Sequence, residues 1–229
     1  MRMVIIGGSA GLGFATAQRA LSSNVELVIG GRSEERLQQA KKALGGSVTT
    51  FSVDVRDEAS VEAFFKTVGP FDHLVTPGNS SHPGTFKSTE EARASFDSKY
   101  WGQYFAAKHG HPFIRDGGSI VLFSGALGTR PTQDCGIMVS INGAVEALAR
   151  ALAMDLAPHV RVNAIAPGAI ESPRLAELME SNPAVGVSND QAVPRLGSPD
   201  EVAQGVLFLC TNGYMSGSVL HVDGGYTLR

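Results

Sequence analysis

Residues 3–21 read MVIIGGSAGLGFATAQRAL, which is a short apolar run, a glycine-rich turn and a helix-like segment in succession. Glycines permit a tight turn here and let the backbone approach a pyrophosphate at the N-terminus of the helix. A glycine-rich turn is by itself a weak signal, and an ordinary strand-to-helix turn is the alternative. Its place between a first strand and a helix favours dinucleotide binding. The expected cofactor contacts of the turn are Gly7, Ser9, Gly11, Leu12 and Gly13.

The same alternation of apolar runs and helical patterns continues along the chain. Strand-like runs occupy residues 3–6, 25–29, 48–53, 73–76, 119–123, 160–166 and 219–222. Helical patterns occupy residues 11–21, 34–44, 59–68, 90–109, 138–156 and 199–210. Unbroken apolar strands are typical of a parallel sheet covered on both faces. The pattern predicts an α/β, three-layer, doubly wound Rossmann fold of about seven strands, with residues 1–229 as one domain.

Composition narrows the class of protein. The chain has 229 residues, 43% of them hydrophobic and 18% charged, with a net charge of −3. The sequence contains no basic run, so we do not expect a nucleic-acid partner. Its longest apolar run is far shorter than a membrane span. The apolar start leads into the glycine turn, so we interpret it as a strand and not a signal peptide. Two cysteines without metal-like spacing fit a cytoplasmic protein with no metal site.

The longest irregular stretch runs from Pro167 to Pro199. It has little periodicity and contains Pro173, Pro183, Gly186 and Pro194. Long loops inside compact domains are usually functional. We therefore expect residues 167–199 to form a substrate loop or lid over a small-molecule substrate.

The end of the second strand bears on the choice of cofactor. An acidic residue there would bind the adenosine ribose hydroxyls, but Gly31 and Arg32 occupy the position. A guanidinium suits a 2′-phosphate, so the sequence favours NADP(H) over NAD(H). The alternative is that Arg32 is only solvated at the start of the next helix. Asp54, just past the third strand, either accepts a hydrogen bond from the adenine amino group or caps the following helix.

Together these segments resemble the short-chain dehydrogenase/reductase family along nearly the whole chain. The glycine turn matches its glycine motif, and Asp54-Val55 matches its adenine-contacting pair. The stretch VRVNAIAPGAIESP, residues 160–173, is similar to the segment after its sixth strand. There Pro167-Gly168 follows the strand, and Ser172 stands where a threonine usually contacts the nicotinamide amide. Residues 143–158, 195–203 and 216–225 match further motifs of its C-terminal half.

The resemblance implies a strand order of 3-2-1-4-5-6-7 and a homo-oligomer, a dimer or tetramer, packed partly through the long helices. It also implies a catalytic Asn-Ser-Tyr-Lys tetrad, which this chain lacks. Alignment on residues 142–153 puts Met138 at the tyrosine and Asn142 at the lysine. The usual spacing puts Gly125 at the serine, next to Ser124, and Lys99 at the asparagine. A thioether has no proton to give, so Met138 is interpreted as a core residue of the helix stripe.

Lysine and asparagine have exchanged places. If the fold brings Lys99 and Asn142 together, the site keeps one ammonium and one amide, and Lys99 would reach the nicotinamide ribose. The alternative is that Lys99 is an ordinary exposed helix lysine. Ser124 is a candidate proton donor, while Ser140 should point to another helix face. His82, in the loop after the fourth strand, titrates near neutrality and is a further candidate.

Two functions stay open. The first is an NADP(H)-dependent short-chain oxidoreductase with a rewritten proton relay, acting on a small carbonyl or alcohol. Its candidate catalytic residues are Lys99, Ser124, Met138 and Asn142. The second is a catalytically silent NADP(H)-binding protein, or an oligomeric scaffold.

Overall fold

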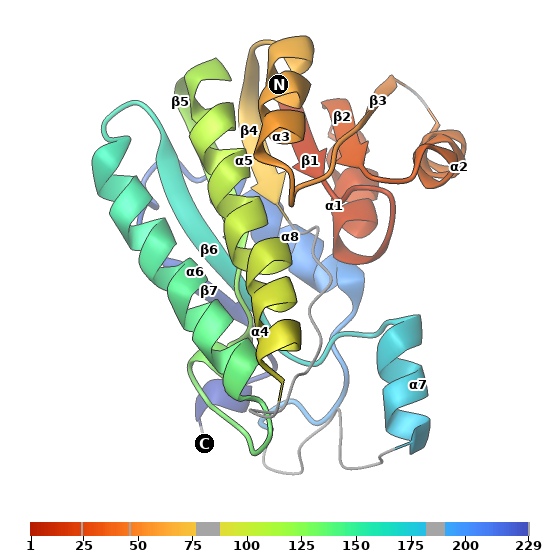
Figure 1. Cartoon of the computed structure of the whole chain (residues 1–229), viewed down its shortest axis with the longest axis vertical. Coiled ribbons are helices and arrows are strands. Elements are labelled where there is room, and N and C mark those ends of the chain that lie inside the picture. Colours follow the sequence, from red (N-terminus) through yellow and green to blue (C-terminus); the bar gives the residue numbers. More distant parts are fainter. Residues whose placement is uncertain (24, 46, 77–87, 182–190, 229) are drawn as a thin grey trace.

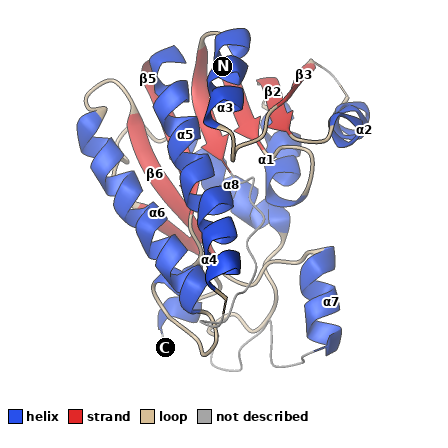
Figure 2. Cartoon of the chain, in the orientation of Figure 1, coloured by secondary structure: helices blue, strands red, loops and turns tan. Residues whose placement is uncertain are grey.

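The chain folds into a single seven-stranded parallel sheet with helices on both faces (Figures 1 and 2). The computed structural model describes residues 1–23, 25–45, 47–76, 88–181 and 191–228. The strands are β1 (Arg2–Ile6), β2 (Glu26–Gly31), β3 (Val48–Ser52), β4 (Phe71–Thr76), β5 (Ile114–Phe123), β6 (Arg161–Pro167) and β7 (Val219–Val222). Their order, β3-β2-β1-β4-β5-β6-β7, confirms the order expected from the sequence.

Helices cover the sheet in two layers. They are α1 (Gly11–Leu21), α2 (Glu34–Leu44), α3 (Glu58–Val68), α4 (Thr89–Phe96), α5 (Gly102–Gly110), α6 (Gly136–Asp155), α7 (Pro173–Ser181) and α8 (Pro199–Thr211). One core cluster packs α3, α5 and α6 against one face of the sheet, and a second packs α1, α2 and α8 against the other. Fully buried strand residues such as Ile5 and Leu74 point alternately into the two clusters. Strands buried on both faces explain their unbroken apolar runs.

The predicted helix over residues 90–109 is divided in the structure. α4 ends at Phe96, a π-helical turn spans Asp97–Trp101, and α5 follows. In the π turn the Gly102 N–H donates to the Asp97 carbonyl, five residues back. Such a turn adds one residue to the helical repeat and is frequent at functional sites. Ser98 and Lys99 are buried within it, so Lys99 is not the exposed helix lysine that was one of the two expectations.

The long helix α6 begins at Gly136, two residues earlier than predicted. Its buried residues are Ile137, Ile141, Asn142, Val145, Leu148, Ala149 and Ala153. Met138 is half-buried, so its interpretation as a core residue was wrong, because Ile137 occupies that inner position. By length and composition alone α6 would be long and apolar enough to cross a membrane. Here it packs along β5 and β6 as a core helix of the domain (Figure 1).

The described parts of the stretch 167–199, residues 167–181 and 191–199, are more regular than the sequence indicated. The residues described there include helix α7 and a parallel bridge between Ile170 and Gly197. The Ser172 hydroxyl accepts a hydrogen bond from the Leu175 N–H at 3.1 Å, and Pro173 suits the first helical position. The periodicity was missed because α7 has only nine residues. α7 lies beside the carboxyl end of the sheet (Figure 1), which is where a substrate loop is expected.

Candidate active site

The glycine turn after β1 forms a cradle of backbone. Gly7 and Gly11 have φ values of +92° and +53°, which a residue with a side chain rarely adopts. A Cβ on Gly8 would lie 2.7 Å from the Ile29 side chain, whereas a Cβ on Gly11 would meet nothing within 4 Å. No side chain among the described residues caps the N-terminus of α1, and its first turn holds no acidic residue. Free N–H groups and a positive helix end therefore fit a pyrophosphate.

At the end of β2, the Arg32 side chain is exposed and has no bonded partner among the residues that the structure describes. Ser9 of the glycine turn lies beside this end, because its Oγ is 3.6 Å from the position of a Cβ on Gly31. A guanidinium without an internal partner, next to the dinucleotide cradle, fits an anionic group such as a 2′-phosphate.

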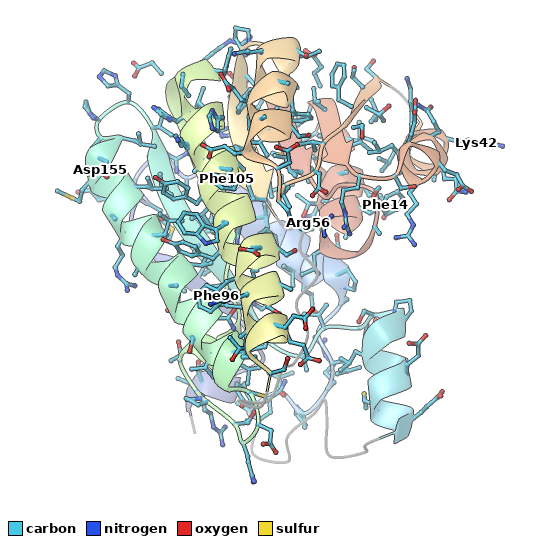
Figure 3. All side chains as sticks on the ribbon, viewed as in Figure 1. Phe14, Lys42, Arg56, Phe96, Phe105 and Asp155 are labelled. Atoms are coloured by element: carbon cyan, nitrogen blue, oxygen red, sulfur yellow. The ribbon has the colours of Figure 1, made fainter. Side chains whose placement is uncertain are left out.

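Asp54 binds a second arginine, Arg56, close to this region. The Arg56 guanidinium donates two hydrogen bonds to its carboxylate, at 3.1 and 2.8 Å (Figure 3 labels Arg56). These bonds lower the pKa of Asp54, and the charge of Arg32 adds a smaller effect of the same sign. Asp57, not Asp54, caps α3, so the capping alternative for Asp54 was wrong. Sequence reasoning missed Arg56, although it follows Val55, the other half of the expected adenine-contacting pair.

Lys99 and Asn142 meet in the interior. The Lys99 ammonium donates to Asn142 Oδ1 at 2.6 Å and to the Ser124 carbonyl at 3.0 Å. Both side chains are almost fully buried, with exposed fractions of 4% and 1%. Burial lowers the pKa of Lys99 from 10.5 to about 8, and the Glu146 carboxylate opposes part of that shift. The exchange seen in the sequence therefore leaves a bonded ammonium–amide pair, while its part in catalysis stays a prediction.

Ser124 links this pair to an acidic residue. The Ser124 hydroxyl donates to Glu146 Oε1 at 2.6 Å, while the Ser124 carbonyl accepts from Lys99. The hydroxyl proton is thus directed at a carboxylate and not at an open cleft. Glu146 stands one helical turn after Asn142, and this i, i+4 spacing was the signal that sequence reasoning overlooked.

Gln103 holds the Lys99 segment in place. Its side-chain amide donates to the carbonyls of Lys99 and Phe123, both at 3.0 Å, and accepts from the Phe123 N–H at 2.6 Å. It also accepts from the Thr76 hydroxyl at 2.8 Å. One buried amide therefore ties the ends of β4 and β5 to the π turn. Gln103 lies four residues after Lys99 and was also missed in the sequence.

The other proton-donor candidates lie elsewhere. Ser140 is exposed and donates to the Gly136 carbonyl of its own helix, as its position predicted. Tyr100, the neighbour of Lys99 in the π turn, was not among the candidates, and its ring stacks on Tyr104 at a centroid distance of 6.5 Å. His82 falls outside the described residues, so its place stays a prediction.

The expected nicotinamide end combines β6 and α7. Gly168 approaches the chain after β7 so closely that a Cβ on it would lie 2.8 Å from Asp223 Cα, and the preceding Pro167 ends β6. Ser172 caps α7 through its oxygen, and its O–H has no acceptor among the described residues. From Ser172 an open groove of about 710 Å³ runs along α7. It is lined mainly by apolar side chains, among them Ala176, Met179 and Leu196.

This combination of a doubly wound sheet and a glycine cradle at the end of its first strand defines a dinucleotide-binding protein of the Rossmann type. A family model described as enoyl-(acyl carrier protein) reductase matches residues 7–227. A short-chain dehydrogenase/reductase of Stachybotrys chlorohalonatus is 29% identical, covering 99% of this chain and 97% of that protein. The chain belongs to the short-chain dehydrogenase/reductase family.

Two solved structures are informative neighbours. A small-chain dehydrogenase in complex with NADPH has a TM-score of 0.81 and 31% identity, covering 100% of this chain and 99% of that one. An NADPH-bound short-chain oxidoreductase of Pseudomonas aeruginosa PAO1 has a TM-score of 0.89 and 26% identity, with coverage of 100% and 97%. The second is described as containing an atypical catalytic center.

Proposed function

We propose that this protein is an NADP(H)-dependent oxidoreductase that interconverts a small carbonyl compound and its alcohol. The bound cofactor would supply or accept the hydride. The glycine cradle and α1 would hold its pyrophosphate, Arg32 its 2′-phosphate and Asp54 its adenine. Ser172 would donate to the nicotinamide amide, and the substrate would lie along α7.

The observation that carries the proposal is the buried bond between Lys99 and Asn142. Burying an ammonium is costly unless it is bonded, and a decayed site has no reason to retain one. The chain has lost all four side-chain types of the tetrad from their usual places, yet it keeps a positive charge and an amide there. The NADPH-bound oxidoreductase described as containing an atypical catalytic center is a similar protein whose site also departs from the usual one.

A silent NADP(H)-binding protein is the second candidate, and Met138 favours it. A thioether cannot transfer a proton, and loss of a positioned acid typically lowers a rate by about 10² to 10⁴. The two candidates share the cofactor site and differ only in turnover.

The test is a fluorescence titration with NADPH and NADH, followed by a carbonyl screen with whichever cofactor binds. Binding of NADPH with oxidation in the presence of at least one aldehyde or ketone supports the oxidoreductase. Binding without oxidation across aliphatic, aromatic and acyl-thioester carbonyls supports the silent protein. Binding of neither cofactor would contradict both.

The proposal also covers the location, the oligomeric state and the partners of the protein. We infer a cytoplasmic homo-oligomer, a dimer or tetramer, with a small-molecule substrate and with neither nucleic acid nor membrane as a partner. The net charge of −3 and the exposed Trp101 ring, which stacks on Phe105, support this setting.

A further inference from the structure

The side-chain amide of Asn142 has one bonded and one unbonded end. Oδ1 accepts the Lys99 ammonium at 2.6 Å, whereas Nδ2 is buried and has no hydrogen-bond partner among the residues described. An exchange of the two ends would turn Nδ2 toward the ammonium and set donor against donor. The charge of Lys99 therefore fixes which end is free. A buried donor without an acceptor is destabilising, and such groups call for an explanation.

The free end of Asn142 is directed at Gly125. A Cβ built on Gly125 would lie 2.9 Å from Nδ2, and the three atoms nearest to that Cβ all belong to the Asn142 side chain. Gly125 is half-buried, so this position borders solvent even though Nδ2 itself is covered in the free protein. Because residue 125 is glycine, no side chain of that residue stands between Nδ2 and this border.

We propose that Asn142 Nδ2 binds the carbonyl oxygen of the substrate, in place of the missing serine and tyrosine hydroxyls. The inference rests on the proposed function. In the reducing direction a hydride adds to the carbonyl carbon, and the electron pair of the C=O bond moves to oxygen. The amide N–H stabilises that oxyanion, and the charge of Lys99 on Oδ1 strengthens it as a donor.

The amide does not give up its proton. The alkoxide takes a proton from water, so carbonyl, reduced cofactor and water yield alcohol, oxidised cofactor and hydroxide. Asn142 is therefore a catalytic residue by contact with the reacting oxygen. Lys99 acts through Asn142 and is a positioning residue.

Asn142→Asp is the sharpest variant, because it keeps the shape and the acceptor for Lys99 but replaces the N–H donor with an oxygen. Asn142→Leu removes the donor without adding charge. Ser140→Ala is the matched control, since Ser140 is exposed on the same helix. For each variant we would measure the thermal midpoint, the Kd of NADPH, kcat/KM with the best carbonyl of the screen, and the isotope effect with deuterated NADPH.

For Asn142→Asp we expect kcat/KM to fall by about 10² to 10³-fold, the magnitude typical of one lost oxyanion donor. The isotope effect should rise because hydride transfer becomes more rate-limiting. The Kd of NADPH should stay within about threefold. The thermal midpoint should not fall, because the variant removes an unpartnered buried donor. Asn142→Leu, where it folds, should show the same kinetic loss, and Ser140→Ala should match the native protein in all four measurements.

Three results would overturn this assignment while the proposed function stands. The first is an unchanged kcat/KM in Asn142→Asp. The second is weaker binding of NADPH with kcat intact, which would assign Nδ2 to the cofactor. The third is a lower thermal midpoint, which would make Asn142 a structural residue. A native protein that turns over no carbonyl would instead refute the proposed function, and this inference with it.

Discussion

At the residue scale, we propose that the choice between NADP(H) and NAD(H) depends on Arg32. We expect NADPH to bind more tightly than NADH, and Arg32→Ala to remove most of that preference. Loss of a charge-assisted contact with a phosphate typically costs about 1.5–3 kcal/mol, or roughly 10- to 100-fold in Kd. Fluorescence titration measures the Kd of each cofactor. The control is Arg36→Ala, at an exposed arginine in the first turn of α2. Equal affinities in the native protein would refute the assignment.

Restoring the family's tyrosine at Met138 and its lysine at Asn142 should have different effects on turnover. Met138→Tyr restores a phenol at a half-buried position, and we expect it to raise turnover of a generic carbonyl at least about tenfold. Asn142→Lys brings a second ammonium against Lys99, which is unfavourable in the interior, so turnover should not rise and the thermal midpoint should drop. Steady-state kinetics and thermal unfolding measure both, with Ser140→Tyr as the control for an added phenol. The reverse ranking would contradict the roles given to these residues.

At the scale of elements, strand β4 carries a buried histidine. Burial lowers the pKa of His73 from 6.5 to about 4, and its Nδ1 lies 2.9 Å from Ser119 Oγ. Between these two pH values the unfolded chain binds a proton that the folded chain does not, so stability falls as the pH drops through this window. The full effect is on the order of 3 kcal/mol.

Denaturant unfolding at pH values across that window tests the histidine. His73→Gln cannot titrate, so its free energy of unfolding should fall less than that of the native protein on acidification. Parallel curves for the two proteins would show that other groups cause the acid sensitivity.

Sequence patterns predicted the regular strands and missed the irregular π turn. All seven strands were predicted, because each is an apolar run between turn residues. The π turn at Asp97–Trp101 was not, because a single added residue is too short a feature to separate from an irregular apolar pattern. At the site, the sequence indicated the exchange of Lys99 and Asn142. It could not indicate the orphaned amide end, which depends on the distance between side chains of separate elements.

At the scale of the whole molecule, one exposed aromatic surface predicts a subunit interface. Trp101, the single tryptophan, is 42% exposed and stacks on Phe105 at a centroid distance of 5.8 Å. Tyr104 lies against both rings. Figure 3 shows the side chains of Phe96 and Phe105 along this α4–α5 segment. Exposed aromatic side chains on a long helix are typical of subunit interfaces.

We expect a closed, symmetric homo-oligomer that buries Trp101. Trp101→Glu should shift the protein toward monomer in sedimentation velocity at micromolar concentration. Tyr214→Glu, an equally drastic change at a fully exposed residue outside both long helices, should leave the oligomer unchanged. A native monomer at that concentration would rule out the oligomer.

The central claim is that a charged Lys99 bonded to Asn142 replaces the lost tetrad, and the pH profile of kcat/KM tests it most directly. With its pKa at about 8, Lys99 is charged below that pH and neutral above it. Activity should therefore decline above pH about 8 in the native protein. Lys99→Arg, where the charge never titrates, should lack this decline. A flat native profile to pH ~9.5, or the same decline in the arginine variant, would contradict the account.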